Sequence, residues 1–332
     1  MTAVSVRATP APARLRGPHG LVWLTLRVHR TALLFWSALV AVFAGALLWA
    51  YGPGHDAART EYVESGCGSG RPNLGCDMGG PAFDRYDYAI GVSGALLAAL
   101  PLLVAAWAGA ALIGRELEHG TAQLAWAQSV SPARWLAAKL AVPAALLAAG
   151  TLTLTLLHRL AWTEGEDLYR NWGYRVWHDD TVFVANGTTA TAHALLGLAL
   201  GALAGLVLRR ALPALAVGAL AALAVINRLG AWRPRLWPTE TAFAADDYPE
   251  TVGMIVEGGA VTSTGARVPI PDCAGEPGCL TARDITGFYA DHHPASHFWP
   301  LHLVEAGIAL ALAALAVTAA FVLLRHRTGP PA

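Results

Sequence analysis

Histidines and an aspartate cluster near the C-terminus of the sequence. The run Asp291-His292-His293, with His297, has side chains of metal-ligand types. His293 and His297 are four residues apart and would share a helix face, but Pro294 disfavours a helix there. We therefore expect a polar loop and no bound metal; the alternative is a metal site formed by His292, His293 and His297.

A second set of ionisable residues lies within apolar runs. Glu305 follows His302 by three residues, so both share one face if the run is helical, and His193 lies in another apolar run. A carboxylate at such a position is costly, which makes it a functional-site hypothesis. The alternative is that Glu305 reaches out to solvent or pairs with Arg159, Arg228 or His193.

The sequence lacks the residues of several enzyme classes. Lys139 is the only lysine, and its neighbours Ala138 and Leu140 rule out a GK[ST] nucleotide-binding loop. There is also no GxSxG and no HExxH motif. We therefore expect a protein that is not an enzyme and has no cofactor of its own.

The elements that must position these residues are long apolar helices. Of the 332 residues, 55% are hydrophobic and 14% charged, whereas soluble domains carry about 25% charged residues. This composition argues against a soluble enzyme, a disordered chain and a nucleic-acid binder. A membrane-spanning helix needs about 20 apolar residues. Six stretches reach or approach that length: Ala32–Tyr51, Ala89–Ile113, Leu136–Leu157, Ala190–Leu208, Ala211–Leu229 and Leu301–Leu324.

We therefore predict an all-α polytopic membrane protein with six transmembrane helices in a lipid bilayer. Short β-rich runs separated by glycine turns predict a small disulfide-tied hairpin in an outer loop. The predicted order is a disordered cytoplasmic tail (1–19), an interfacial helix (20–31), spans one to five (32–229) with outer loops 52–88 and 158–189 and a cytoplasmic segment 114–135, a β-rich outer loop (230–300), span six (301–324) and a cytoplasmic tail (325–332).

The distribution of charge predicts the orientation. With six spans both termini face the same side. That side carries 12 basic and two acidic residues, whereas the three opposite loops carry 11 arginines and 20 acids. Lys and Arg concentrate on the cytoplasmic side, so both termini are expected to be cytoplasmic.

The four cysteines agree with this orientation. Cys67, Cys76, Cys273 and Cys279 all lie in predicted outer loops, two in each loop. An even number on the oxidising face predicts two disulfides. Pairing within each loop is the simplest arrangement, and pairing between the loops is the alternative.

The cytoplasmic segment after span two has helix start and stop signals. Ser131-Pro132 is typical of a helix start, and Gly120-Thr121 breaks the preceding helix. This leaves Ala122–Val130 as a short, partly apolar element across the membrane face, suited to docking a partner protein. The alternative is a connector whose Trp126 and Trp135 are buried in the membrane.

This segment carries a family resemblance. RELEHGTAQLAWAQSVSPARWLAAKL resembles the E-x-E-x-GT…LAWTQ-x-VSR-x-RW…K stretch of actinobacterial ABC transporter permeases of the type-two exporter class. Leu24–Leu34, Gly201–Val217 and His293–Leu312 are similar to the family's first span entry, its hairpin of spans four and five, and its last span entry. The sequence departs from the pattern at Ala127, Pro132 and His297.

The resemblance implies the membrane subunit of an ABC exporter in a bacterial plasma membrane. Two permeases, identical or different, would pair, and each would dock on a separate ATPase subunit that binds ATP. The residues implied in coupling are Glu116, Glu118, Gly120, Thr121, Leu124, Trp126, Gln128 and Arg134. Alternative interpretations are an ATP-independent secondary transporter, a membrane sensor or immunity protein, and a metalloenzyme that uses the histidine cluster.

Overall fold

The computed structural model describes residues 20–67, 80–128, 130–170, 175–249, 253–273 and 278–328. The predicted tail 1–19, Cys76 and the last four residues of the predicted C-terminal tail lie outside these ranges.

The described residues contain six helices long and apolar enough to cross a membrane, which confirms the predicted fold class. Within the bilayer a helix satisfies its own backbone hydrogen bonds, which is why apolar runs of this length fold this way. The spans are α2 (Arg30–Trp49), α4 (Pro81–Trp107), α7 (Pro132–Glu164), α10 (Thr189–Leu208), α11 (Ala211–Trp232) and α13 (Phe298–Thr328). The first span continues through the π-helical η1 (Ala50–Gly54) into α3 (His55–Glu64), and the second through the π-helical η2 (Ala108–Gly114) into α5 (Arg115–Glu118).

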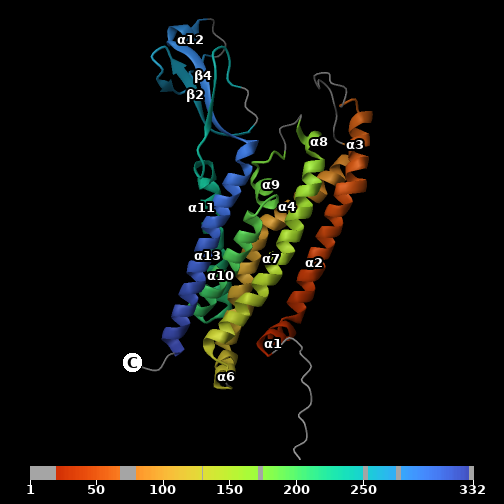
Figure 1. Cartoon of the computed structure of the whole chain (residues 1–332), viewed down its shortest axis with the longest axis vertical. Coiled ribbons are helices and arrows are strands. Elements are labelled where there is room, and N and C mark those ends of the chain that lie inside the picture. The colour runs from red at the N-terminus through yellow and green to blue at the C-terminus, as the bar shows by residue number, and fades with distance from the viewer. Residues whose placement is uncertain are drawn as a thin grey trace, which may run out of the picture.

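The spans form one elongated bundle with two distinct ends (Figure 1). At one end lie α1 (Leu21–Val28), in the predicted interfacial segment, and α6 (Thr121–Ala127); we call this the α6 end. A β-sheet stands at the opposite end, the sheet end. The short helices α8 (Glu166–Arg170) and α9 (Asp180–Ala185) lie between α7 and α10 in the sequence, towards the sheet end.

Glycines on α10 bring its backbone against the second span. A Cβ atom added to Gly197 would lie 2.3 Å from the carbonyl oxygen of Pro101, and one added to Gly201 would lie 2.2 Å from that of Ala105. Small residues four apart allow such close helix packing in membranes. This contact makes α10 the centre of the bundle, with α4, η2, α7, α11 and α13 packed around it.

The turn between α10 and α11 is tight. Arg209 adopts a left-handed conformation, with φ of 55°, and Arg210 is extended. α11 begins at Ala211, which places Pro213 in its first turn, where the missing proline N–H costs no hydrogen bond.

The predicted outer hairpin is part of a larger sheet. β2 (Gly253–Thr262) pairs with β3 (Arg267–Val268) as expected, but β1 (Glu240–Ala244) and β4 (Ile285–Pro294) extend the sheet to the order β1-β4-β2-β3, all antiparallel. The expectation of a polar loop at 291–293 is therefore wrong: these residues belong to β4. An isolated hairpin is marginally stable in water, and β4 adds hydrogen bonds to both of its neighbours.

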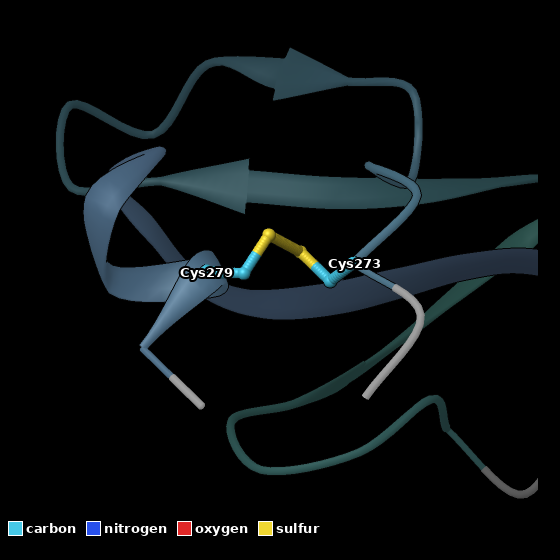
Figure 2. The surroundings of a disulfide bond; sticks show 2 residues. All are labelled: Cys273 and Cys279. Atoms are coloured by element: carbon cyan, nitrogen blue, oxygen red, sulfur yellow. A yellow bond between two sulfur atoms is a disulfide. The ribbon is translucent and has the colours of Figure 1, made fainter. Parts of the chain in front are cut away.

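One predicted disulfide is present in the sheet region. Cys273 and Cys279 are bonded, so the covalent link joins the chain beyond β3 to the start of α12 (Cys279–Ala282), just ahead of β4 (Figure 2). Cys67 is also disulfide-bonded. Because Cys76 lies outside the described residues, the expected Cys67–Cys76 pairing stays a prediction.

Candidate functional site

Glu116 joins helices α5 and α7 at the α6 end. Its carboxylate accepts hydrogen bonds from the Lys139 ammonium and from the indole of Trp135, at 3.1 Å for the latter. Lys139 Nζ also donates to His29 Nε2 at 3.1 Å, and Lys139 is buried. The sole lysine therefore links α5 and α7 to the residue between α1 and α2.

Glu118 connects the same short helix to a different span. Its carboxylate accepts from the backbone N–H of Ala211, the first residue of α11, at 2.9 Å. A carboxylate at a helix N-terminus satisfies a free amide and interacts favourably with the helix dipole. Glu116 and Glu118 thus tie α5 to α7 and to α11 respectively.

A left-handed glycine separates α5 from α6. Gly120 has φ of 71°, a conformation that favours glycine, and the Thr121 hydroxyl donates to the carbonyl of Glu116 at 3.2 Å. Helix breaking at Gly120 is therefore confirmed, with α6 occupying 121–127. Ser131 also caps α7 as predicted, since its side chain accepts from the backbone N–H of Arg134.

The predicted coupling residues of α6 face in two directions. Trp126 packs edge-on against Trp135 and is part-buried, whereas Leu124 is 63% exposed. Gln128 and Arg134 are exposed. The helix therefore presents an apolar side chain, beside polar ones, on a surface anchored to the bundle by tryptophan packing.

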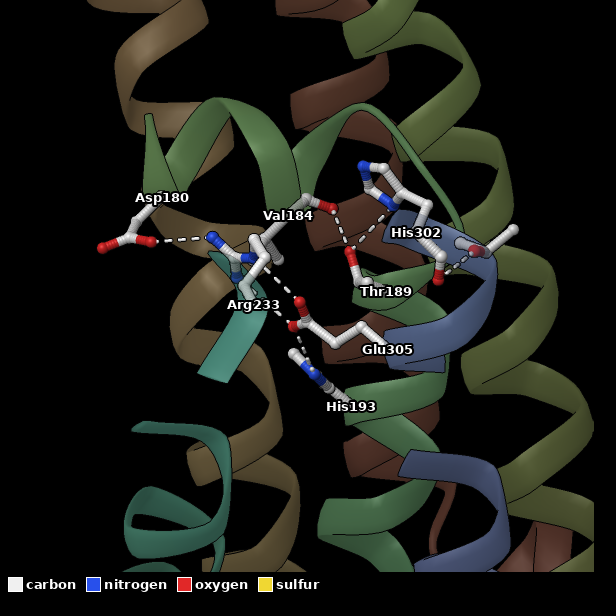
Figure 3. Close-up of polar contacts among 8 residues, drawn as sticks. Asp180, Val184, Thr189, His193, Arg233, His302 and Glu305 are labelled. Atoms are coloured by element: carbon white, nitrogen blue, oxygen red, sulfur yellow. Dashed lines mark hydrogen bonds and ion pairs between the residues drawn. The ribbon is translucent and has the colours of Figure 1, made fainter. Parts of the chain in front are cut away.

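A buried ionic cluster lies near the sheet end (Figure 3). Arg233 donates from Nε to Glu305 Oε2 at 2.7 Å and from Nη2 to Oε1 at 3.2 Å. His193 Nε2 lies 3.4 Å from Glu305 Oε1. Glu305, His193 and Arg233 are all buried, and the third guanidinium nitrogen, Nη1, donates to Asp180 at 2.8 Å.

Of the expected partners of Glu305, the structure brings in His193 only. Arg159 donates to the backbone carbonyl of Asn186 at 3.1 Å, and its guanidinium lies over the Phe298 and Trp299 rings. Arg233, which sequence reasoning missed, takes the place expected for Arg159 or Arg228. It follows α11 directly, in the 3₁₀ turn η3 (Arg233–Arg235), and its position at the end of an apolar run was the available signal.

His302 is buried beside this cluster but has other contacts. Its ring stacks on Phe183 at a centroid distance of 3.8 Å, and its Nδ1 lies 3.3 Å from the hydroxyl of Thr189. His302 therefore joins α13 to α9 and α10, while Glu305 joins α13 to η3.

The three histidines of the metal-like cluster do not converge. Successive residues of a strand point to opposite faces, so His292 and His293 in β4 diverge. His293 Nδ1 lies 3.0 Å from His297 Nδ1, its Nε2 lies 2.9 Å from the carbonyl oxygen of Pro234, and His297 pairs with Glu240. Within the described ranges, no group of three or more His, Cys, Asp or Glu side chains is placed to hold a metal ion.

Comparison with protein families matches residues 37–233 to the family described as "ABC-2 membrane transporter related". The chain belongs to this family. The matched range covers most of the first span and all of the next four, the α6 segment and Arg233. No curated protein and no solved structure matches the chain.

Membership makes this chain a permease component of an ABC transporter, a membrane transport subunit that is not itself catalytic. Of the two sites, Glu116, Glu118 and the α6 segment lie inside the matched range, whereas α1 and His29 precede it. The ionic cluster lies partly outside it, because Glu305 belongs to α13.

Proposed function

We propose that this ABC-2 permease is the membrane subunit of an exporter driven by a separate ATPase subunit that docks at the α6 end. In this arrangement the α6 end and both termini are cytoplasmic, the sheet is outside the cell, and the membrane is the bacterial plasma membrane. The predicted excess of basic residues on the α6 side supports this orientation.

One observation carries the proposal: α6 is exposed at its apolar Leu124, and the helix directly before it, α5, is bonded to two other spans. Glu116 bonds to Trp135 and Lys139 on α7, and Glu118 caps α11. A displacement of α6 by the ATPase would therefore move α4, α7 and α11 together. Coupling of this kind needs contiguous packed elements with two arrangements.

Two permeases, as a homodimer or heterodimer, would surround one translocation path. ATP binds only to the ATPase in this scheme, since the permease sequence has no Walker A loop. A secondary transporter is the other candidate, favoured by the buried carboxylate of Glu305. Its pairing with Arg233 gives that candidate less support, because a carrier carboxylate must release and regain a proton.

The docking step is tested by co-purification with the ATPase subunit, which we expect to be encoded beside this gene. Leu124→Glu places a charge on the exposed apolar position and is expected to reduce ATPase recovery at least tenfold. Leu124→Met conserves the apolar character and should retain recovery. Full recovery with Leu124→Glu, in a protein of unchanged melting temperature, would contradict docking on α6.

Transmission is tested separately with Glu116→Gln. This variant keeps the exposed surface of α6 and removes the charge that holds Lys139, so ATPase recovery should persist. The ATP-dependent distance change between spin labels on α6 and α13 should be lost. A normal distance change would contradict the role of Glu116, and abolition of transport by Glu305→Gln without any ATPase requirement would favour the secondary transporter.

A further inference from the structure

A crevice at the α6 end has an apolar and a polar chamber. The apolar chamber, about 220 Å³, lies between α2, α4 and α7 and has Trp36, Leu100 and Leu147 in its wall. The polar chamber, about 640 Å³, lies between α1, α5, α6 and α7. Thr25, His29, Ala32 and Trp107 line both chambers, so the two are adjoining parts of one crevice.

The apolar chamber faces the hydrocarbon of the bilayer. Phe35 and Leu103 line it and are 71% and 57% exposed, on two helices that span the membrane. The Trp36 side chain in its wall is held in place, since its indole donates to the carbonyl of Leu146 at 3.2 Å and its ring packs against Gly150. The exposed side chains of Phe35 and Leu103 leave the chamber accessible to a hydrocarbon chain from the side.

The polar chamber carries an uncompensated cation. Its charged lining residues are Arg115, Lys139 and Glu116. Lys139 and Glu116 form an ion pair, whereas the exposed guanidinium of Arg115 has no hydrogen-bond or ion-pair partner among the described residues. Arginine binds phosphate oxygens in a bidentate manner, and the hydroxyl of Thr31 and the amide of Gln128 line the same chamber.

We propose that this crevice binds an anionic phospholipid from the leaflet at the α6 end. The phosphate would lie on Arg115 in the polar chamber, and one acyl chain would pass Ala32 into the apolar chamber. Basic pockets between transmembrane helices recognise anionic headgroups in this way. Leu124, the residue on which the proposed docking is tested, lines neither chamber. Loss of ATPase binding in Leu124→Glu and loss of lipid binding can therefore be distinguished.

Native mass spectrometry of the purified full chain tests this with phosphatidylglycerol, phosphatidylcholine of the same acyl chains, and soluble glycerol 3-phosphate. We expect phosphatidylglycerol to bind at least tenfold more tightly than phosphatidylcholine, and glycerol 3-phosphate not to displace it. Equal binding of the two lipids would overturn the proposal. Complete displacement by glycerol 3-phosphate would also overturn it, since the site would then bind a free phosphate ester.

Two variants locate the lipid. Arg115→Gln should lower phosphatidylglycerol affinity about tenfold, whereas Arg325→Gln, which removes the same charge from an exposed position at the end of α13, should not. Ala32→Phe should block the passage between the chambers, whereas Ala38→Phe, on an exposed part of α2 outside both chambers, should not. If Arg115→Gln or Ala32→Phe binds like its control at an unchanged melting temperature, the proposal is wrong.

Discussion

Arg233 and Glu305 form a two-point ion pair across 72 positions of sequence, with nitrogen–oxygen distances of 2.7 and 3.2 Å, and both side chains are buried. The pair joins the turn after α11 to the sixth span, and the remaining guanidinium nitrogen of Arg233 reaches Asp180 at the start of α9. Three elements that are separate in sequence therefore meet at one cation.

Removal of one member of the buried pair should destabilise the protein strongly. Arg233→Gln leaves the Glu305 carboxylate buried without its cation, so we expect the free energy of unfolding to fall by about 3–5 kcal/mol. Thermal and denaturant unfolding of the purified protein in detergent measures this.

Asp180→Asn is the matched control for this pair. The side chain of Asp180 is 88% exposed, and an exposed ion pair contributes about 0–1 kcal/mol. The double variant Arg233→Gln/Glu305→Gln should recover part of the loss because no unpaired charge remains. Equal losses in the free energy of unfolding for Arg233→Gln and Asp180→Asn would show that the buried pair contributes no more to stability than the exposed contact.

The close packing of α10 on α4 should not tolerate a methyl group. Gly201→Ala places a Cβ 2.2 Å from the Ala105 carbonyl oxygen, and overpacking of this kind costs about 1–3 kcal/mol. Gly307→Ala is the matched control, since its Cβ would meet nothing within 4 Å. We expect a lower melting temperature for Gly201→Ala only; similar melting temperatures would contradict the packing role of this glycine.

The two ends of the bundle should label from opposite sides of the membrane. Thr264→Cys lies in the exposed turn between β2 and β3, and Gln123→Cys lies on exposed α6. A membrane-impermeant maleimide should modify Thr264→Cys on intact cells and Gln123→Cys only after permeabilisation. The reverse pattern would place the α6 end outside and contradict the proposed orientation. The unmodified sequence is the blank, since Cys67, Cys273 and Cys279 are disulfide-bonded and any labelling of Cys76 is measured in it directly.

Acidification should loosen α1 and α2 from α7 through His29. Burial lowers the pKa of His29 below its ordinary 6.5, the Lys139 ammonium lowers it further, and Glu116 partly opposes both. Because the unfolded chain binds the proton more readily, the stability that His29 contributes is complete above pH 6.5 and declines as the pH falls below it. Besides Lys139 and Glu116, the ionisable side chains that line the polar chamber with His29 are Arg115 and His119.

Melting temperatures measured between pH 7.5 and 5.5 test this prediction, because this range spans the ordinary histidine pKa of about 6.5. The fall in melting temperature should be smaller in His29→Gln, which cannot gain a proton, than in the natural sequence. His326→Gln is the control, since His326 is exposed at the end of α13. An identical fall in the natural sequence and in His29→Gln would assign the pH dependence to other groups.

Local sequence signals predicted the elements well wherever the hydrogen bonds are local. Apolar runs of membrane length became helices because a helix satisfies its own backbone, and Gly120, Ser131 and Pro132 mark helix boundaries through their own conformational preferences. β4 was missed because a central strand depends on partners far away in the sequence. Its neighbours β1 and β2 provide hydrogen bonds that no local pattern reveals.

The amino-acid sequence by itself determined the six spans, the charge difference between the two sides and the position of the α6 segment, because these depend on composition and local conformation. Only the tertiary structure decided which charges meet: Arg233 rather than Arg159 or Arg228 binds Glu305, Glu118 caps α11, and Lys139 holds Glu116. A buried charge must be compensated within hydrogen-bond distance, and helix packing alone determines which partner lies that close.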